Sequence, residues 1–134
     1  MKRILAIDDD IYRYEHFQRM LEPHNIKVDI VCCSECIKKY ITTASAILLD
    51  YDLDNGELCE CENLPDKAKS IHHVDLISQY NLPVIISSAS WIENRIALSD
   101  ALKKRNIIHT RISANDTQPE LLWVGWLFVN GVFQ

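Results

Sequence analysis

The fold of this chain can be worked out from the stretch Ala46–Gly56, which reads Ala-Ile-Leu-Leu-Asp-Tyr-Asp-Leu-Asp-Asn-Gly. Its short apolar run stops abruptly at Asp50, a pattern typical of a parallel strand that is buried on both faces and ends at the edge of a sheet. Two other stretches share this pattern: Ile4–Ile7 runs into three aspartates, and Val84–Ile86 runs into two serines. Three such endings predict one polar site at one edge of a parallel sheet.

Strand and helix patterns alternate along the whole chain. Asp10 and Ser34 are suitable N-caps for the first two predicted helices, and Pro119 suits the first turn of the last one. Strands are expected over residues 3–7, 26–31, 46–49, 84–87 and 107–112, and helices over 11–22, 34–42, 66–80, 92–104 and 119–129.

This alternation predicts the α/β fold class, with a single doubly wound, flavodoxin-like (βα)5 domain over residues 1–134. Right-handed crossovers would place helices on both faces of a five-stranded parallel sheet. For the strand order 2-1-3-4-5, the topological switch point lies between the first and third strands, where open sheets of this kind bind ligands. Those two strands end in Asp8-Asp9 and in Asp50.

Composition and charge exclude several classes of protein. The chain is 48% hydrophobic and 25% charged, which is ordinary for a globular protein and too apolar for a disordered one. Its net charge of −5 disfavours direct DNA binding, because nucleic-acid affinity comes largely from basic contacts to phosphates. The longest mostly apolar run, residues 121–129, is far shorter than the roughly 20 residues of a membrane span. We therefore expect a cytoplasmic protein whose cysteines are thiols.

The aspartates at the predicted switch point indicate a metal site. Carboxylates that converge on a crevice repel one another, so a counter-ion is needed to keep them all ionised. Mg²⁺ prefers oxygen ligands and is often held by one or two carboxylates together with a phosphate. We expect Mg²⁺ as the cofactor, with Asp8, Asp9, Asp50 and Asp52 as candidate ligands.

A metal beside Asp50 favours phosphoryl chemistry. An aspartate can attack phosphorus and form an aspartyl phosphate. Because phosphoryl transfer depends mainly on positioning and charge stabilisation, a hydroxyl and a cation would complete the site. Ser88 is the candidate hydroxyl, Arg111 on the fifth predicted strand is the candidate cation, and Asp50 completes the predicted catalytic set.

The segments Ile4–Asp10, Leu48–Asp50 and Pro83–Ala89 resemble the receiver domain of two-component response regulators. The resemblance runs over nearly the whole chain. The fifth strand of that family ends in Lys-Pro, whereas residues 109–112 of this chain are His-Thr-Arg-Ile.

This resemblance implies a set of roles for the polar residues. Asp8 and Asp9 would hold Mg²⁺, Asp50 would accept a phosphoryl group, and Ser88 would be the switch hydroxyl. It also implies a partner protein, either a kinase or a downstream effector. The protein would then be a phosphoryl-signalling domain without an attached output domain.

A narrower resemblance is to the cyclic-phosphate processing receiver domain, an offshoot of the same family. It is carried by Asp50–Leu53, by Arg13 with Phe17, and by Ser87–Ser90 followed by Glu93-Asn94. That group is thought to act on cyclic phosphates, which implies a metal-dependent hydrolase as an alternative function.

The chain departs from the offshoot's pattern at several positions. Tyr51 and Ser87 stand where the offshoot has histidines, and Ser90-Trp91 stands where it has Asn-Pro. If those histidines do acid–base work in the offshoot, the residues that could take over that role in this chain are His72, His73 and His109.

Two other metal sites stay open on the residues alone. Asp50–Cys61 hints at a calcium loop, although its glycine comes one place late and its twelfth residue is a cysteine. Cys33 with Cys36, and Cys59 with Cys61, could supply four thiolates to zinc, although the second spacing is tight.

The last predicted helix, residues 119–129, is apolar on all sides. Burial of one face accounts for part of this pattern, and the remaining apolar surface is a candidate contact for a homodimer or a partner. A third possible function follows, in which the chain is a degenerate receiver that works only as a binding module.

Overall fold

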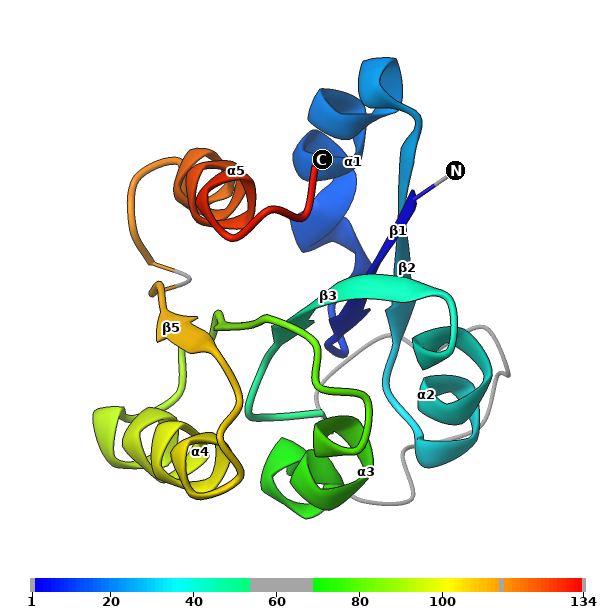
Figure 1. Cartoon of the computed structure of the whole chain (residues 1–134). Helices are drawn as coiled ribbons and strands as arrows, with labels where there is room; N and C mark the ends of the chain where they lie inside the picture. Colours follow the sequence, from blue (N-terminus) through cyan, green and yellow to red (C-terminus); the bar gives the residue numbers. More distant parts are fainter. Residues whose placement is uncertain (1, 54–68, 114, 134) are drawn as a thin grey trace.

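The computed structural model describes residues 2–53, 69–113 and 115–133. Its sheet has the strand order β2-β1-β3-β4-β5, and every neighbouring pair is parallel (Figure 1). This confirms the predicted doubly wound α/β fold and its strand order. The strands are β1 (Lys2–Ile7), β2 (Ile26–Val31), β3 (Ala44–Leu49), β4 (Val84–Ile86) and β5 (His109–Arg111).

Helices cover both faces of the sheet. Figure 1 shows α1 (Glu15–Leu21) and α5 (Pro119–Val129) on one face. The other face carries α2, α3 and α4, which run over Ser34–Ile41, Val74–Ser78 and Ile92–Lys104. Short 3-10 helices span Ile11–Tyr14 (η1), Glu22–His24 (η2) and Ser70–His73 (η3).

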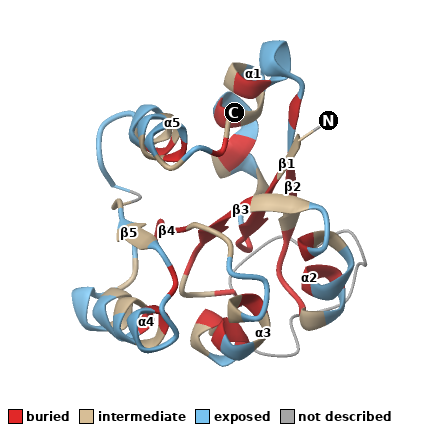
Figure 2. Ribbon diagram, viewed as in Figure 1, coloured by how far each residue is buried: buried red, intermediate tan, exposed pale blue. Residues whose placement is uncertain are grey.

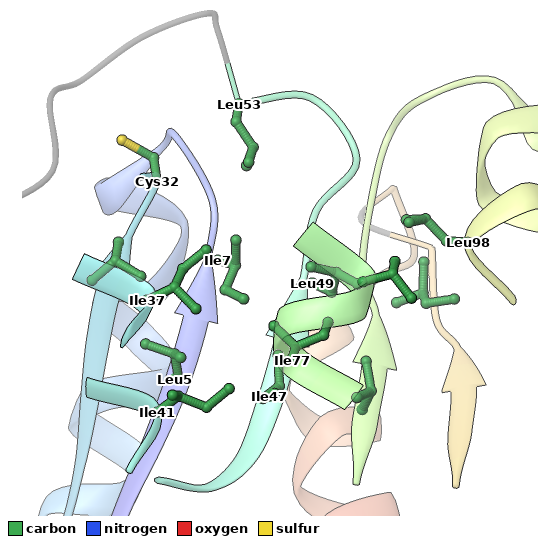
Figure 3. Close-up of a cluster of buried hydrophobic side chains, with 14 of the residues drawn as sticks. Leu5, Ile7, Cys32, Ile37, Ile41, Ile47, Leu49, Leu53, Ile77 and Leu98 are labelled. Atoms are coloured by element: carbon green, nitrogen blue, oxygen red, sulfur yellow. The ribbon is translucent and has the colours of Figure 1, made fainter. Parts of the chain in front are cut away.

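Strand side chains alternate between two cores, because successive residues of a strand point to opposite faces. In β1, Leu5 and Ile7 belong to the core with α2, α3 and α4, whereas Ile4 belongs to the core with α1 and α5. In β3, Ile47 and Leu49 join the first of these cores (Figure 3). Figure 2 shows buried residues along the central strands and on the sheet-facing sides of helices. This two-sided burial explains why the strands are nearly continuous apolar runs.

An aromatic cluster fixes the segment that follows β1. The ring of Trp123, a buried residue of α5, lies 5.7 Å from the ring of Tyr14 and 5.2 Å from that of Phe17. Such aromatic pairs add about 0.5–1.5 kcal/mol each beyond the area they bury. The cluster therefore holds η1, which ends at Tyr14, against the carboxyl end of β1.

The helix starts differ in detail from the sequence prediction. The helix expected over 11–22 begins as the 3-10 helix η1, and Asp10 is its N-cap as predicted, accepting the N–H of Tyr12 at 3.1 Å. The N-cap of α2 is Cys33 rather than Ser34. The Cys33 backbone is extended, and its Sγ accepts the N–H of Cys36 at 3.5 Å.

Two expected elements are shorter in the structure. Within the helix expected over 66–80, η3 and α3 span residues 70–78, and residues 66–68 lie outside the described part of the chain. The strand expected over 107–112 is regular only at β5, an edge strand with one neighbour. None of the helices in the described ranges is long and apolar enough to cross a membrane.

Candidate functional site

Three aspartates from two neighbouring strands meet at the carboxyl edge of the sheet. Asp8 and Asp9 follow β1, and Asp50 follows β3. The N–H of Asp50 donates to the carbonyl of Ile7 at 2.9 Å, which continues the β1–β3 pairing and keeps the two strand ends side by side. One carboxylate oxygen from each aspartate lies within 4.8 Å of the others, and all three residues are buried. The structure therefore gathers the predicted acidic cluster at the switch point.

Asp8 accepts hydrogen bonds on both carboxylate oxygens. Its Oδ2 accepts the hydroxyl of Tyr14 at 2.5 Å and a hydrogen bond from Arg13, and its Oδ1 accepts the N–H of Asp10 at 3.0 Å. Burial, followed by the negative charge of Asp50, raises the pKa of Asp8 from 3.8 to about 8. The charge of Arg13 and the hydrogen bond from Tyr14 oppose this rise and do not cancel it.

Arg13 is the positive charge inside the cluster. Its Nη1 donates to Asp8 and lies 3.7 Å from Oδ2 of Asp50. Its Nη2 donates to the carbonyl and the hydroxyl of Ser87 at 3.1 and 3.2 Å, which ties η1 to the end of β4. Burial disfavours the charge, but Tyr14 and both aspartates favour it, and the pKa of Arg13 is raised. The guanidinium thus bridges three of the segments that build the site.

Asp50 is positioned by Tyr51 and Ser88. Its Oδ1 accepts the N–H of Tyr51 at 2.9 Å. Burial raises the pKa of Asp50, although a hydrogen bond from Ser88 and the charge of Arg13 oppose the rise. The Ser88 oxygen in turn accepts the N–H of Ser90 at 3.1 Å. The predicted hydroxyl therefore lies against the predicted phosphoacceptor.

A pocket of about 440 Å³ opens over these carboxylates. Asp52 belongs to its wall, where Lys69 Nζ lies 2.5 Å from Asp52 Oδ1. The Asp52 carboxylate is outside the set of three converging oxygens, so its predicted part in metal binding stays a prediction. The residues lining the pocket are Asp8, Asp9, Asp10, Arg13, Asp50, Asp52, Ala89, Ser90 and Asn115.

Within the described part of the chain, Arg13 is the cation that contacts the carboxylates. Arg111, the cation expected from the fifth strand, does not contact them, and its role in binding a phosphoryl group stays a prediction. Arg111 is the last residue of β5, pairs with Ile86 and is exposed. It is not among the residues that line the acidic pocket. The reason is local: β5 is a short edge strand whose last side chain turns to solvent, whereas η1 is packed by Tyr14 directly onto the site.

Sequence reasoning missed Arg13 as the counter-charge and Tyr14 as a donor to Asp8. A signal for both was present. Asp10 caps the turn that follows β1, so residues three and four positions after it lie one turn further on the same side of the chain. Both therefore return towards the strand end that carries Asp8.

The other predicted metal sites depend on residues outside the described ranges. Cys33 and Cys36 are buried, but Cys59 and Cys61, which the zinc hypothesis also requires, are not described. The same holds for residues 54–61 of the possible calcium loop.

The histidines lie apart from the acidic cluster. His73 is buried with its Nδ1 3.3 Å from the hydroxyl of Ser34, and His72 is exposed. His109 has its Nε2 2.8 Å from the hydroxyl of Ser99 and its Nδ1 2.8 Å from a backbone carbonyl. The acidic pocket contains none of the three in its described lining.

Comparisons with known proteins identify the fold. No protein-family model matches the chain, and no curated protein does. Among solved structures, this chain is similar to a response regulator receiver domain protein (CheY-like) from Methanospirillum hungatei JF-1. The TM-score is 0.65 at 18% identity, covering 98% of this chain and 96% of that one. This chain has the receiver fold.

Other solved structures with the receiver fold are also similar to this chain. The BeF3-activated N-terminal receiver domain of RstA from Klebsiella pneumoniae has a TM-score of 0.63 at 18% identity, covering 94% of this chain and 97% of that one. A two-component response regulator from Clostridium difficile has a TM-score of 0.64 at 17% identity, covering 97% and 96%. NtrX from Brucella abortus, a longer chain, is matched over 28% of its length with a TM-score of 0.64 and 17% identity. At these identities the likeness shows the fold, and the chemistry must be argued from the residues.

Proposed function

We propose that this receiver-fold protein binds Mg²⁺ at Asp8, Asp9 and Asp50 and accepts a phosphoryl group on Asp50. One observation carries the proposal: three buried carboxylates from two strands converge to within 4.8 Å, beside the guanidinium of Arg13. Burying so many acids together is costly unless a cation is held among them.

The residues present fit a hard divalent cation. All three donors are carboxylate oxygens, the ligand type that Mg²⁺ prefers. Burial and the neighbouring Asp50 raise the pKa of Asp8 to about 8, a sign that the charge of the cluster is incompletely balanced by the chain. When bound, the cation would neutralise charge on an incoming phosphoryl group. Asp52, on the pocket wall, is a further candidate ligand.

Asp50 is the nucleophile in this proposal. One of its carboxylate oxygens would form a bond to phosphorus while the bond from phosphorus to the donor's leaving oxygen breaks. The products would be an acyl phosphate on Asp50 and the released donor anion. Arg13 would bind phosphoryl oxygens, a role for which the guanidinium fork is well shaped. It would replace the lysine that the receiver resemblance places at the end of the fifth strand.

A partner protein would complete the signalling function. Phosphorylation acts by changing local charge at an element that has two arrangements. Ser88 bonds both Asp50 and the N–H of Ser90, so a change at Asp50 would reach the residues just before α4. We therefore propose a kinase that supplies the phosphoryl group and an effector that contacts the β4–α4 connection. The exposed apolar side chains of α5, namely Leu121, Leu122, Phe128 and Val129, are a candidate surface for a homodimer or for that effector.

The phosphoacceptor proposal is tested by mass. The protein is incubated with Mg²⁺ and acetyl phosphate, and the intact mass is measured. We expect a phosphate-sized gain in the wild type and none in Asp50→Asn. Asp100→Asn, at an exposed position of α4, is the matched control and should still gain it. A wild-type protein that binds Mg²⁺ but shows no gain would contradict the proposal.

A second candidate function is the metal-assisted hydrolysis of a cyclic phosphate. It is favoured by the position of Arg13, a residue of the offshoot pattern, against both Asp8 and Asp50. Water would attack phosphorus and one ester bond of the ring would open, giving a phosphate monoester. Cyclic nucleotides and RNA 2′,3′-cyclic ends are assayed with Mg²⁺ for the wild type and Arg13→Gln. Absence of turnover across the panel contradicts hydrolysis, and a stable partner with both assays silent would support a binding module.

A further inference from the structure

A second hollow adjoins the acidic pocket. It has a volume of about 530 Å³ and is lined by Asp52, Ala89, Ser90, Trp91, Ile92 and Arg95. The first three of these residues line the acidic pocket as well, so the two spaces are neighbours. Both volumes fall within the range of roughly 300–1,000 Å³ that small-molecule sites occupy. A ligand with its phosphate at the carboxylates would extend into this second space.

Trp91 presents an aromatic surface to the second hollow. The residue is 79% exposed, although an indole is large and mostly apolar. An aromatic side chain in this position binds planar rings well, and stacking of one base on it is worth about tenfold in affinity or more. Exposure of Trp91 beside the acidic pocket therefore favours a ligand that carries both a phosphate and a flat ring.

Arg95 lies in the first turn of α4 and lines the same hollow as Trp91. Its backbone N–H donates to the carbonyl of Trp91, the N-cap of α4, at 3.2 Å, which holds the two residues together at the start of the helix. The Nε atom of Arg95 is buried and has no hydrogen-bond partner within the described ranges. A buried donor without a partner is destabilising. Arg95 lines the hollow, so its guanidinium offers N–H donors to an acceptor atom on a ligand bound there.

We propose that Trp91 and Arg95 form a subsite for the base of a nucleotide whose phosphate occupies the acidic pocket. Trp91 stacks on the base, and Arg95 donates to a ring nitrogen or a carbonyl oxygen on the base edge. This inference rests on the phosphate chemistry proposed for Asp50 and Arg13. It names the class of phosphate ester that the site selects.

The test compares ligands with and without a base. Binding of AMP, GMP, CMP and UMP to the Mg²⁺-loaded protein is measured by calorimetry, with ribose 5-phosphate as the ligand that lacks a ring. We expect at least one nucleotide to bind about tenfold more tightly than ribose 5-phosphate and to quench tryptophan fluorescence. Trp91→Leu should remove both the preference and the quenching. Arg95→Gln should weaken binding of the nucleotide and leave the affinity for ribose 5-phosphate unchanged.

Matched controls use residues away from the two pockets. Tyr80→Leu removes another exposed aromatic side chain, and Lys104→Gln removes a charge from the exposed end of α4; both should keep the preference. Because Trp91 is largely exposed, its variants should fold, and Trp91→Phe should retain part of the preference as a second check.

The outcomes separate this inference from the proposed function. If nucleotides and ribose 5-phosphate bind with equal affinity, and the protein still gains mass from acetyl phosphate, the subsite is overturned and the phosphoacceptor proposal stands. If the protein gains no mass from acetyl phosphate but prefers nucleotides, and Trp91→Leu removes this preference, the phosphoacceptor proposal is overturned and the subsite is supported. A preference that survives both Trp91→Leu and Arg95→Gln also overturns the subsite.

Discussion

The Nη1 atom of Arg13 lies 3.7 Å from Oδ2 of Asp50. The same guanidinium hydrogen-bonds Asp8 and reaches the carbonyl and hydroxyl of Ser87. The acidic cluster thus carries a counter-ion supplied by the chain, at the place where a phosphoryl group would approach Asp50. Metal binding, stability and phosphoryl transfer should all depend on this arginine.

Replacement of Arg13 by Gln should lower the free energy of unfolding without metal by about 3 kcal/mol, because removing one partner of a buried ion pair leaves uncompensated charge. Saturating Mg²⁺ should restore more stability to Arg13→Gln than it adds to the wild type. Urea unfolding with and without Mg²⁺ measures both effects. Arg19→Gln, an exposed position on α1, is the control and should change stability by less than about 0.5 kcal/mol. Equal stability of the two variants would contradict the role of Arg13.

At about pH 9, where Asp8 is ionised, Tyr14→Phe should cost about 1.5–3 kcal/mol, the contribution of a hydrogen bond to a charged group, because the variant loses its donor to Asp8. The stacking on Trp123 should survive, since the ring is unchanged. Chemical denaturation of the metal-free protein measures the loss. Tyr12→Phe, which removes a hydroxyl from an exposed ring, should be neutral. If Tyr14→Phe is as stable as Tyr12→Phe, the Tyr14 hydroxyl does not stabilise the fold through Asp8.

Stability without metal should fall as pH rises. Burial, followed by the charge of Asp50, raises the pKa of Asp8 from 3.8 to about 8, so between these values the folded protein holds a proton that the unfolded chain has lost. The stabilising contribution is complete below the unfolded pKa and is lost as pH rises through the folded one. Mg²⁺ binds the ionised carboxylate, so its affinity should increase over the same interval.

Calorimetric Mg²⁺ titrations at about pH 6 and about pH 8 check this linkage, since metal binding should release fewer protons at the higher pH. Asp8→Asn is the matched variant and should flatten the pH dependence of metal-free stability. A metal-free wild-type stability that does not fall across this interval would contradict a raised pKa for Asp8.

The rate of phosphoryl transfer should separate the two arginines. Arg13→Gln should slow labelling by acetyl phosphate by about a hundredfold, the usual cost of removing one preorganised donor to a developing charge. Arg111→Gln should change the rate by no more than about twofold, as surface substitutions generally do. Time courses of the intact mass give both rates. If Arg111→Gln slows labelling more than Arg13→Gln does, the catalytic cation is Arg111 on β5.

Much of the fold could be predicted because its signals are local. Apolar runs such as Ile4–Ile7 and Ile47–Leu49 are continuous since both faces of the sheet are covered, and each run ends where the chain leaves the core. The alternation of strands and helices then predicts a parallel sheet with helices on both faces, and the order 2-1-3-4-5 is assumed as the arrangement of its strands. The element ends were less predictable: the sulfur of Cys33 caps α2 in preference to Ser34, and β5 is curtailed at the sheet edge.

The meeting of Asp8, Asp9 and Asp50 followed from topology alone, because hydrogen bonding between parallel neighbours places their carboxyl ends side by side. The partners of that cluster did not follow. A long side chain such as that of Arg13 or Arg111 can reach many places, and its final one depends on packing and on the charge and burial of groups distant in the chain. Only the folded protein shows that Tyr14, packed on Trp123, carries Arg13 to Asp50, while Arg111 is left in solvent.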